Sequence, residues 1–104
     1  MNEHSNDEIA ALLDKAADLL KNGGWIQHRL RNAAGAYCMY GALIKGAGEK
    51  AGSPSTVADA ALRAVRRALP LGRHPIEWND APGRKELGVR RLLLKTARKL
   101  RAEA

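Results

Sequence analysis

The side chains that could support catalysis or bind a metal ion are few and scattered. The histidines and cysteines are limited to His4, His28, His74 and Cys38. Their spacing matches no metal-ligand pattern. Cys38 and His28 would form a nucleophile and a base across a hairpin, but no third group is placed to orient the histidine. A buried structural thiol is the simpler role for Cys38, so we expect no catalytic residue, no metal site and no cofactor.

Basic side chains are more informative, because they are unevenly distributed. The net charge is +7, and residues 1–52 hold six Lys/Arg and six Asp/Glu, whereas residues 53–104 hold twelve and five. Such an excess favours a nucleic acid or another polyanion as partner. No helix-turn-helix is apparent, so the contact would not be sequence-specific, and a solvated helix face is the alternative. The predicted phosphate-binding cations are Arg63, Arg66, Arg67, Arg91, Lys95, Arg98 and Lys99.

Two leucines in the last basic segment offer a different contact surface. Leu87 and Leu94 stand seven residues apart and fall off the apolar face of the predicted helix. With Arg90 and Arg101 beside them, they could contact another chain. The alternative is a wide apolar face that is buried within the domain. The sequence leaves open whether the arginines or the leucines meet the partner.

The phrase EWNDAPGR at residues 77–84 combines turn formers with helix-capping residues. Asn79 and Asp80 are typical helix caps, and the proline after them is tolerated near a helix start. Trp78 would anchor the segment against the core. The simplest interpretation is therefore a helix-start motif. The functional alternative is a polar recognition surface that Asn79, Asp80 and Arg84 form on a loop.

Composition places all of these residues in one small domain, residues 1–104, with residues 1–5 disordered. The chain is long enough for one core and too short for two. Its hydrophobic fraction is 45%, and its abundant Ala and Leu with only 4% aromatic residues favour helices. A single cysteine, no bilayer-spanning apolar run and a polar, acidic start predict a soluble cytoplasmic protein without membrane contact.

Apolar residues at helical spacing predict four helices, each with its own boundary signals. Ser5 and Glu8 have the spacing of a capping box, and two glycines end the first helix. Pro70 and Gly72 end the third. The predicted helices cover about residues 6–22, about residues 39–50, the span from a cap at Ser53 or Ser55 to Leu69, and about residues 84–102.

The stretch between the first two helices has no single interpretation. Residues 25–31 alternate between apolar and polar side chains, which is typical of a strand, and residues 32–35 suit a turn before a second strand. A hairpin would have to lie against the helices, because it is marginally stable alone. An irregular or helical conformation is the alternative. The predicted fold is mainly α, a single-domain bundle of about four helices, with or without one short β-hairpin.

Several phrases occur in an order that resembles a group of small uncharacterised actinobacterial and actinophage proteins. GGWIQHRL, GAYCMYGAL, an Ala-rich helix and EWNDAPGR before a last helix carry the resemblance, which spans nearly the whole chain. The strongest matches are CMYGAL at residues 38–43 and WNDAPGR at residues 78–84. Lys85 departs from the group, where a small polar residue, often Thr, is expected, and the last helix is more basic. The resemblance implies a compact domain of unknown activity, a phage or phage-derived origin and no catalytic residue.

These observations predict a non-enzymatic, small basic binding protein, and its partner is the open question. The first hypothesis is that it contacts nucleic acid through a basic C-terminal helical face. The alternative is a protein-interaction module, either a binder of a host protein or a homodimer joined through the last helix.

Overall fold

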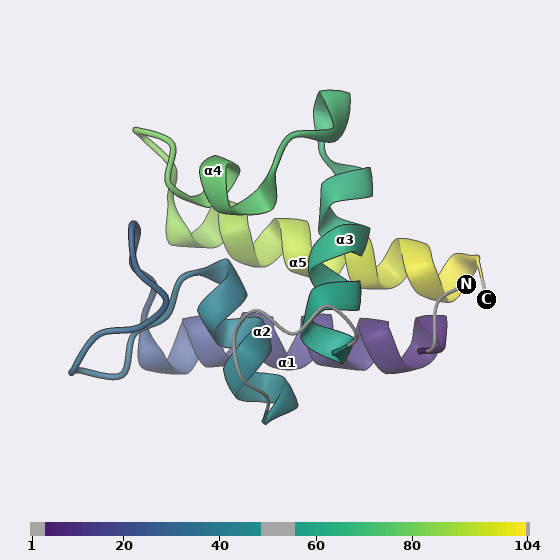
Figure 1. Cartoon of the computed structure of the whole chain (residues 1–104), viewed down its shortest axis with the longest axis horizontal. Helices are drawn as coiled ribbons and strands as arrows, with labels where there is room; N and C mark the ends of the chain where they lie inside the picture. The colour runs from purple at the N-terminus through teal and green to yellow at the C-terminus, as the bar shows by residue number, and fades with distance from the viewer. Residues whose placement is uncertain (1–3, 49–55, 104) are drawn as a thin grey trace.

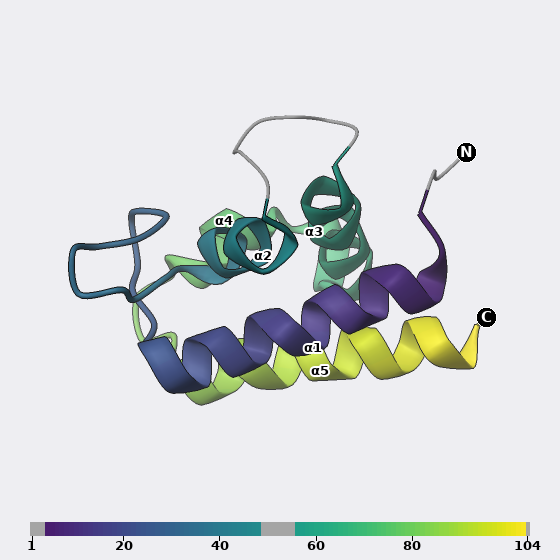
Figure 2. The ribbon, with the colours of Figure 1, turned by 90° about the horizontal axis from the view of Figure 1, so that it is seen from below.

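The computed structural model describes residues 4–48 and 56–103, and the regular elements in these ranges are helices. The elements are α1 (Asn6–Gly23), α2 (Met39–Ala47), α3 (Val57–Ala68), the 3₁₀ turn η1 (Pro70–Gly72), α4 (Pro75–Asn79) and α5 (Glu86–Ala102). The long helices α1 and α5 lie side by side and antiparallel (Figure 1). The shorter helices α2, α3 and α4 lie together on one side of this pair (Figure 2). The prediction of a mainly α fold is confirmed.

Helix α1 has the predicted Ser5 cap and glycine end, while the Glu8 carboxylate of the predicted capping box contacts His4 Nδ1 at 3.1 Å. Ser5 Oγ accepts the N–H of Glu8 at 3.0 Å. At the other end, Gly24 has a φ of +98° and donates its N–H to the Leu20 carbonyl at 3.0 Å. Its apolar stripe is buried, and comprises Ile9, Leu12, Leu13, Ala16 and Leu20. The predicted helix over about residues 6–22 is confirmed.

The core lies between the α1–α5 pair and the shorter helices. Helix α5 contributes the buried residues Val89, Leu93 and Leu100 to the core, and Leu92 packs against the core while partly buried. Helix α3 contributes mostly small residues, and Ala58, Ala60, Ala61, Leu62, Ala64 and Val65 are buried. Each fully buried Leu or Val contributes about 1.5–3 kcal/mol relative to an exposed one. The face of α5 that the sequence assigned to the core is the face that packs on α1 and α3.

The cap of α3 and the end of α2 differ from the predicted ones. Ser53 and Ser55, the predicted caps of the third helix, lie outside the described residues. The cap is instead Thr56, whose Oγ1 accepts the N–H of Asp59 at 3.0 Å. Helix α2 ends before Gly48, which has a φ of +67°, so it does not continue to the predicted end at about residue 50.

The interpretation of EWNDAPGR as a helix start is wrong, because the phrase follows the beginning of another helix. Helix α4 starts at Pro75, whose fixed φ suits a first helical position, and the His74 imidazole caps it by accepting the N–H of Ile76 at 3.2 Å. Asn79 is therefore the last residue of α4. Helix α5 begins later than predicted, after Lys85, whose side chain makes no capping hydrogen bond.

Residues 24–38 form an irregular loop, and the predicted β-hairpin is not formed in this described segment. Backbone pairing is limited to two isolated bridges, which join Tyr37 to Trp25 in parallel and to Arg31 in antiparallel orientation. His28 has a φ of +71°, a left-handed conformation that interrupts the alternation required of a strand. The irregular alternative is the one observed.

Candidate functional site

Asn79 is the centre of a hydrogen-bond network that holds the 24–38 loop against the helices. Its side chain is 1% exposed. The Oδ1 atom accepts the indole N–H of Trp25 at 2.7 Å and the backbone N–H of Met39 at 3.1 Å. The Nδ2 atom donates to Asp80 Oδ1 at 2.9 Å and to a loop carbonyl at 3.4 Å. One buried amide thus joins the start of the loop, the start of α2 and the end of α4; we call it the Asn79 hub.

Backbone carbonyls and the Asp80 carboxylate next to the hub add further contacts to the loop. Gln27 Nε2 donates to the carbonyls of Asn79 and Ala81, at 3.0 and 2.9 Å. Asp80 Oδ1 accepts the backbone N–H of His28 at 2.9 Å. This bond to a charged acceptor holds the residue whose backbone is left-handed, which offsets part of the conformational cost.

Trp78 and Arg84 close the turn between α4 and α5. The Arg84 guanidinium carbon lies 3.7 Å from the centroid of the Trp78 ring, and Arg84 Nε donates to the Trp78 carbonyl at 2.8 Å. Desolvation, and then the charge of nearby Arg73, lower the pKa of Arg84. The four residues predicted as an anchor or recognition surface therefore all make contacts within the chain; they are Trp78, Asn79, Asp80 and Arg84.

Two glycines allow the loop to lie close to the helices. A Cβ added to Gly41 in α2 would lie 1.9 Å from the carbonyl oxygen of Leu30. A Cβ added to Gly23 at the end of α1 would lie 2.8 Å from the carbonyl oxygen of Gly35. Both neighbours are backbone atoms, which cannot turn away as the end of a flexible side chain can. The packing of the loop therefore requires glycine at these two positions.

Cys38 is a buried capping residue. It is 4% exposed, and its Sγ accepts the N–H of Gly41 at 3.3 Å at the start of α2. Burial raises the pKa of the Cys38 thiol, which disfavours the thiolate that a nucleophile requires. His28 is exposed, and its Nδ1 lies 3.8 Å from Asp80 Oδ2. The chain thus uses both residues in local structural contacts.

The cations of α5 lie on its solvent side. Arg91, Lys95 and Lys99 follow one another at four-residue intervals, and Arg98 is seven residues after Arg91, so all four share one side of the helix. All four are exposed, and none forms an ion pair with another described residue. With Arg67, considered next, they constitute what we call the basic face.

Arg67 joins this surface from α3. It lines a groove of about 230 Å³ together with Lys99 and Glu103, over a floor of small and apolar side chains from α3 and α5. The other two predicted cations of α3 have partners on their own side of the helix. Arg63 pairs with Asp59, and Arg66 Nε donates to the Gly72 carbonyl at 2.9 Å. The structure thus brings five of the seven predicted cations together.

The two predicted interface leucines occupy different environments. Leu87 is 45% exposed, whereas Leu94 is partly buried and packs on the core. The predicted arginines beside them are paired within the chain. Arg90 Nε lies 3.3 Å from Glu86 Oε2, and Arg101 Nη2 lies 2.8 Å from Asp14 Oδ2 of α1.

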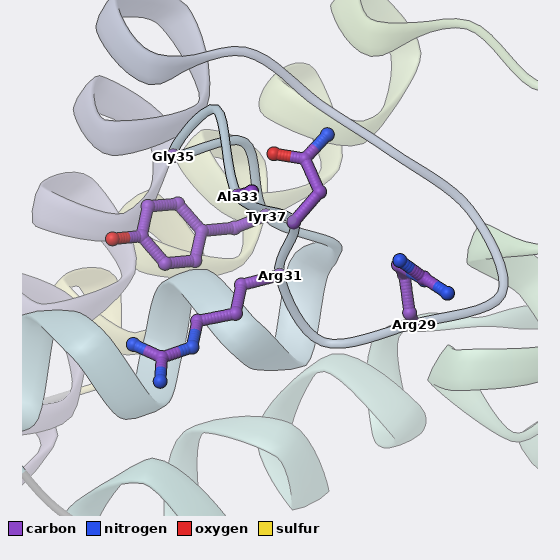
Figure 3. A pocket seen from close by; sticks show the side chains of 6 residues that line it. Arg29, Arg31, Ala33, Gly35 and Tyr37 are labelled. Carbon is purple, nitrogen blue, oxygen red and sulfur yellow. The ribbon is translucent and has the colours of Figure 1, made fainter.

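A hollow that the sequence did not indicate lies on the 24–38 loop. It has a volume of about 490 Å³ and is lined by Arg29, Arg31, Asn32, Ala33, Gly35 and Tyr37. Figure 3 shows the side chains of Arg31 and Tyr37 pointing to the same side of the loop, with Arg29 on a different part of it. Both arginines belong to the charge-balanced half of the chain, where net charge gives no signal.

Over residues 4–48 and 56–103, no three His, Cys, Asp or Glu residues are grouped so that they could hold a metal ion. The described helices include none that is both long and apolar enough to cross a membrane.

Comparison with known proteins gives one match. A family model described as a family of unknown function, DUF6197, matches residues 4–99. Neither the curated proteins nor the solved structures contain a match to this chain. The matched region includes the Asn79 hub, the hollow and the whole basic face.

Proposed function

We propose the following role for this chain, which belongs to the DUF6197 family of unknown function: it is a non-enzymatic protein that binds nucleic acid through phosphate contacts made by the basic face. The observation that carries the proposal is the row Arg91, Lys95 and Lys99 on α5, with Arg98 beside it and Arg67 across the groove. The row forms no ion pair with another described residue, in contrast to the paired Arg90 and Arg101, and the carboxylate that lies beside it is Glu103, in the groove with Arg67 and Lys99.

Energetics support a role outside folding for this row. Like charges four residues apart destabilise a helix by about 0.2–0.5 kcal/mol per pair. The row contains two such pairs, Arg91 with Lys95 and Lys95 with Lys99. A phosphate backbone would remove this repulsion and release its own counterions on binding. The repulsion within this row destabilises the free protein, and its removal would therefore favour the complex with nucleic acid.

The contact is with phosphates rather than with base sequence. A helix-turn-helix joins its two helices through a short turn, so that the second helix enters the major groove. Here α3 and α5 are separated by η1 and α4, and α5 packs along the length of α1. Phosphate contacts position a protein on nucleic acid without reading its sequence.

The setting we propose is that of a phage-encoded or phage-derived protein acting in the cytoplasm. It rests on the resemblance of the CMYGAL and WNDAPGR phrases to actinobacterial and actinophage proteins. In that setting the nucleic acid and the protein share one compartment.

The proposal is tested by comparing two triple variants that remove the same charge from different surfaces. One carries Arg91→Gln, Lys95→Gln and Arg98→Gln on the basic face. The control carries Lys15→Gln, Lys21→Gln and Lys45→Gln, three exposed lysines of α1 and α2. Fluorescence anisotropy with a labelled DNA duplex of random sequence at low salt measures the affinity of each. We expect the basic-face variant to bind roughly tenfold more weakly or worse, and the control to stay within about threefold of the unmodified protein.

Equal losses in the two variants would mean that net charge alone attracts the duplex, and would contradict a defined basic face. Absence of binding by the unmodified protein at low salt would contradict the proposal as a whole.

A second candidate function is supported by the exposure of Leu87. This leucine shares the solvent side of α5 with Arg91 and Arg98, four and eleven residues further on. An apolar side chain rimmed by cations suits an acidic surface of another protein. A second copy of the chain fits less well, because self-association through this face would oppose cations to cations. Sedimentation velocity should therefore report a monomer for both the unmodified protein and Leu87→Ser; a dimer lost on Leu87→Ser would favour the homodimer instead.

A further inference from the structure

The 24–38 loop is more elaborate than a connection between two helices requires. Fifteen residues without regular structure join α1 to α2, whereas helix–helix connections in bundles usually need two to eight residues. Loops of this length are uncommon in compact domains unless they bind something. The Asn79 hub and the glycines at 23 and 41 hold this one in a defined shape.

The turn at the tip of the loop is held by its own hydrogen bonds. Asn32 Oδ1 accepts the N–H groups of Ala34 and Ala36, both at 3.0 Å. The Asn32 backbone N–H donates to the Ala36 carbonyl at 3.0 Å, and its carbonyl accepts the N–H of Gly35 at 3.2 Å. These bonds fix the Asn32 amide so that its oxygen is occupied and its Nδ2 hydrogens remain available as donors.

The side chains that line the hollow present hydrogen-bond donors. Arg29 and Arg31 carry guanidinium groups on different parts of the loop, as Figure 3 shows, while Asn32 carries its amide Nδ2 and Tyr37 a hydroxyl. No carboxylate is among the lining residues, and neither arginine pairs with an acidic residue in the described ranges. The ligand that matches this lining is an anion with several acceptor oxygens.

Arg31 and Tyr37 are placed to act together. Their antiparallel bridge puts the two side chains on the same side of the loop, as Figure 3 shows. Guanidinium groups bind phosphate through two parallel N–H···O bonds, and the adjacent aromatic ring offers a flat apolar surface to whatever the phosphate is attached to.

We infer that the hollow formed by Arg29, Arg31, Asn32 and Tyr37 binds a phosphate group, carried either by a free phosphorylated small molecule such as a nucleotide or by a single nucleic-acid strand. The site is separate from the basic face and does not depend on the function proposed for that face. Its volume of about 490 Å³ lies within the range of small-ligand sites.

The test is a titration of the isotope-labelled full chain followed by amide chemical shifts in NMR. Three probes are added separately: inorganic phosphate, AMP and a short single-stranded DNA. The binding variant is Arg29→Gln with Arg31→Gln. It should keep the fold, because both side chains are exposed and bond to no other described residue. The control variant, Lys15→Gln with Lys45→Gln, removes the same charge from exposed positions of α1 and α2, outside both the hollow and the basic face.

We expect shift changes centred on residues 29–37, with the Arg29→Gln, Arg31→Gln variant binding roughly tenfold more weakly and the control unchanged. Changes with phosphate or AMP support a free ligand, and changes with the strand alone support a strand phosphate. Absence of changes at these residues with all three probes, or equal affinity in the binding variant, overturns the inference.

Discussion

The indole N–H of Trp25 donates to the side-chain oxygen of Asn79 at 2.7 Å, across 54 positions of the sequence. The same oxygen accepts the backbone N–H of Met39, so one buried acceptor satisfies donors from two other segments. Buried donors that lose their acceptor cost about 1–3 kcal/mol each. Through Asn79, the EWNDAPGR segment therefore holds the 24–38 loop in place, whereas α5 begins only after the segment has ended.

Replacing Asn79 should therefore destabilise the whole domain. Asn79→Ala leaves the Trp25 indole and the Met39 amide without an acceptor, and we expect a loss of about 2–4 kcal/mol in the free energy of unfolding. Urea denaturation followed by circular dichroism measures this loss. Glu77→Ala, at an exposed position of the same helix, is the matched control and should change stability by no more than about 0.5 kcal/mol. Similar losses in both variants would contradict the role of the hub.

Two glycine-to-alanine substitutions should have opposite signs. At Gly41 the new Cβ would lie 1.9 Å from the Leu30 carbonyl oxygen, so Gly41→Ala must displace the loop and should cost more than about 2 kcal/mol. At Gly88 in α5 a Cβ meets nothing within 4 Å, so Gly88→Ala should stabilise the protein by about 0.5–1 kcal/mol. Thermal unfolding of the two variants checks both signs. A stabilising Gly41→Ala would show that the loop does not lie against α2 as described.

Leu71 should prove to be a destabilising residue. It has a φ of +58° in η1 and its side chain is fully exposed, so it has the steric cost of a left-handed conformation with no burial in return. Leu71→Asn, which tolerates this conformation, should raise the free energy of unfolding by about 0.5–1 kcal/mol. Leu71→Val, with a branched Cβ, should lower it. Denaturant titration of Leu71→Asn and Leu71→Val measures the two free energies of unfolding. The reverse order of stability would contradict a left-handed backbone at this position.

The Cys38 thiol should make stability depend on alkaline pH. Burial raises its folded pKa above the ordinary value of 9.0. The unfolded chain therefore loses this proton first as pH rises, and the stabilisation that is fully present below the unfolded pKa is lost as pH rises through the folded pKa. In Cys38→Ser the hydroxyl can keep the cap on Gly41 but does not titrate in this range. The difference in stability between the two proteins should thus be constant below the unfolded pKa and shrink or reverse as pH rises above 9.0. A constant difference would contradict a buried, neutral thiol.

Local signals in the sequence predicted most of the helical fold. The apolar stripe and caps of α1 are contiguous in sequence, as is the core face of α5, so periodicity and capping rules were sufficient to identify them. The short helix α4 was missed because five residues carry little periodicity and its cap is a histidine, which is outside the usual capping residues.

The loop could not be predicted from local patterns, because distant residues determine its shape. The alternation of residues 25–31 resembles a strand, but the bonds from Asn79 and Asp80 impose an irregular path with a left-handed His28. The residues next to the loop in the sequence do not indicate that Asn79 and Asp80 bond to it. The hollow depends on this path, so it was not predicted either.

The basic face was predicted in part. Four-residue spacing identified the solvent side of α5, and of the three α3 arginines that were also predicted, Arg67 lines the groove beside Lys99. Helical spacing could not show that Arg66 is bonded to the Gly72 carbonyl, or that Arg101 is paired with Asp14 on α1, because both contacts depend on how the chain folds back.

The most direct test of nucleic-acid binding by the basic face is the slope of log affinity against log salt concentration for a random-sequence duplex. Each phosphate-neutralising cation contributes roughly 0.9 to this slope. Removing Arg91, Lys95 and Arg98 together as glutamines should therefore reduce its magnitude by about 2–3, while the Lys15, Lys21 and Lys45 control leaves it unchanged. A slope near zero for the unmodified protein, or the same slope in both triple variants, would contradict the account.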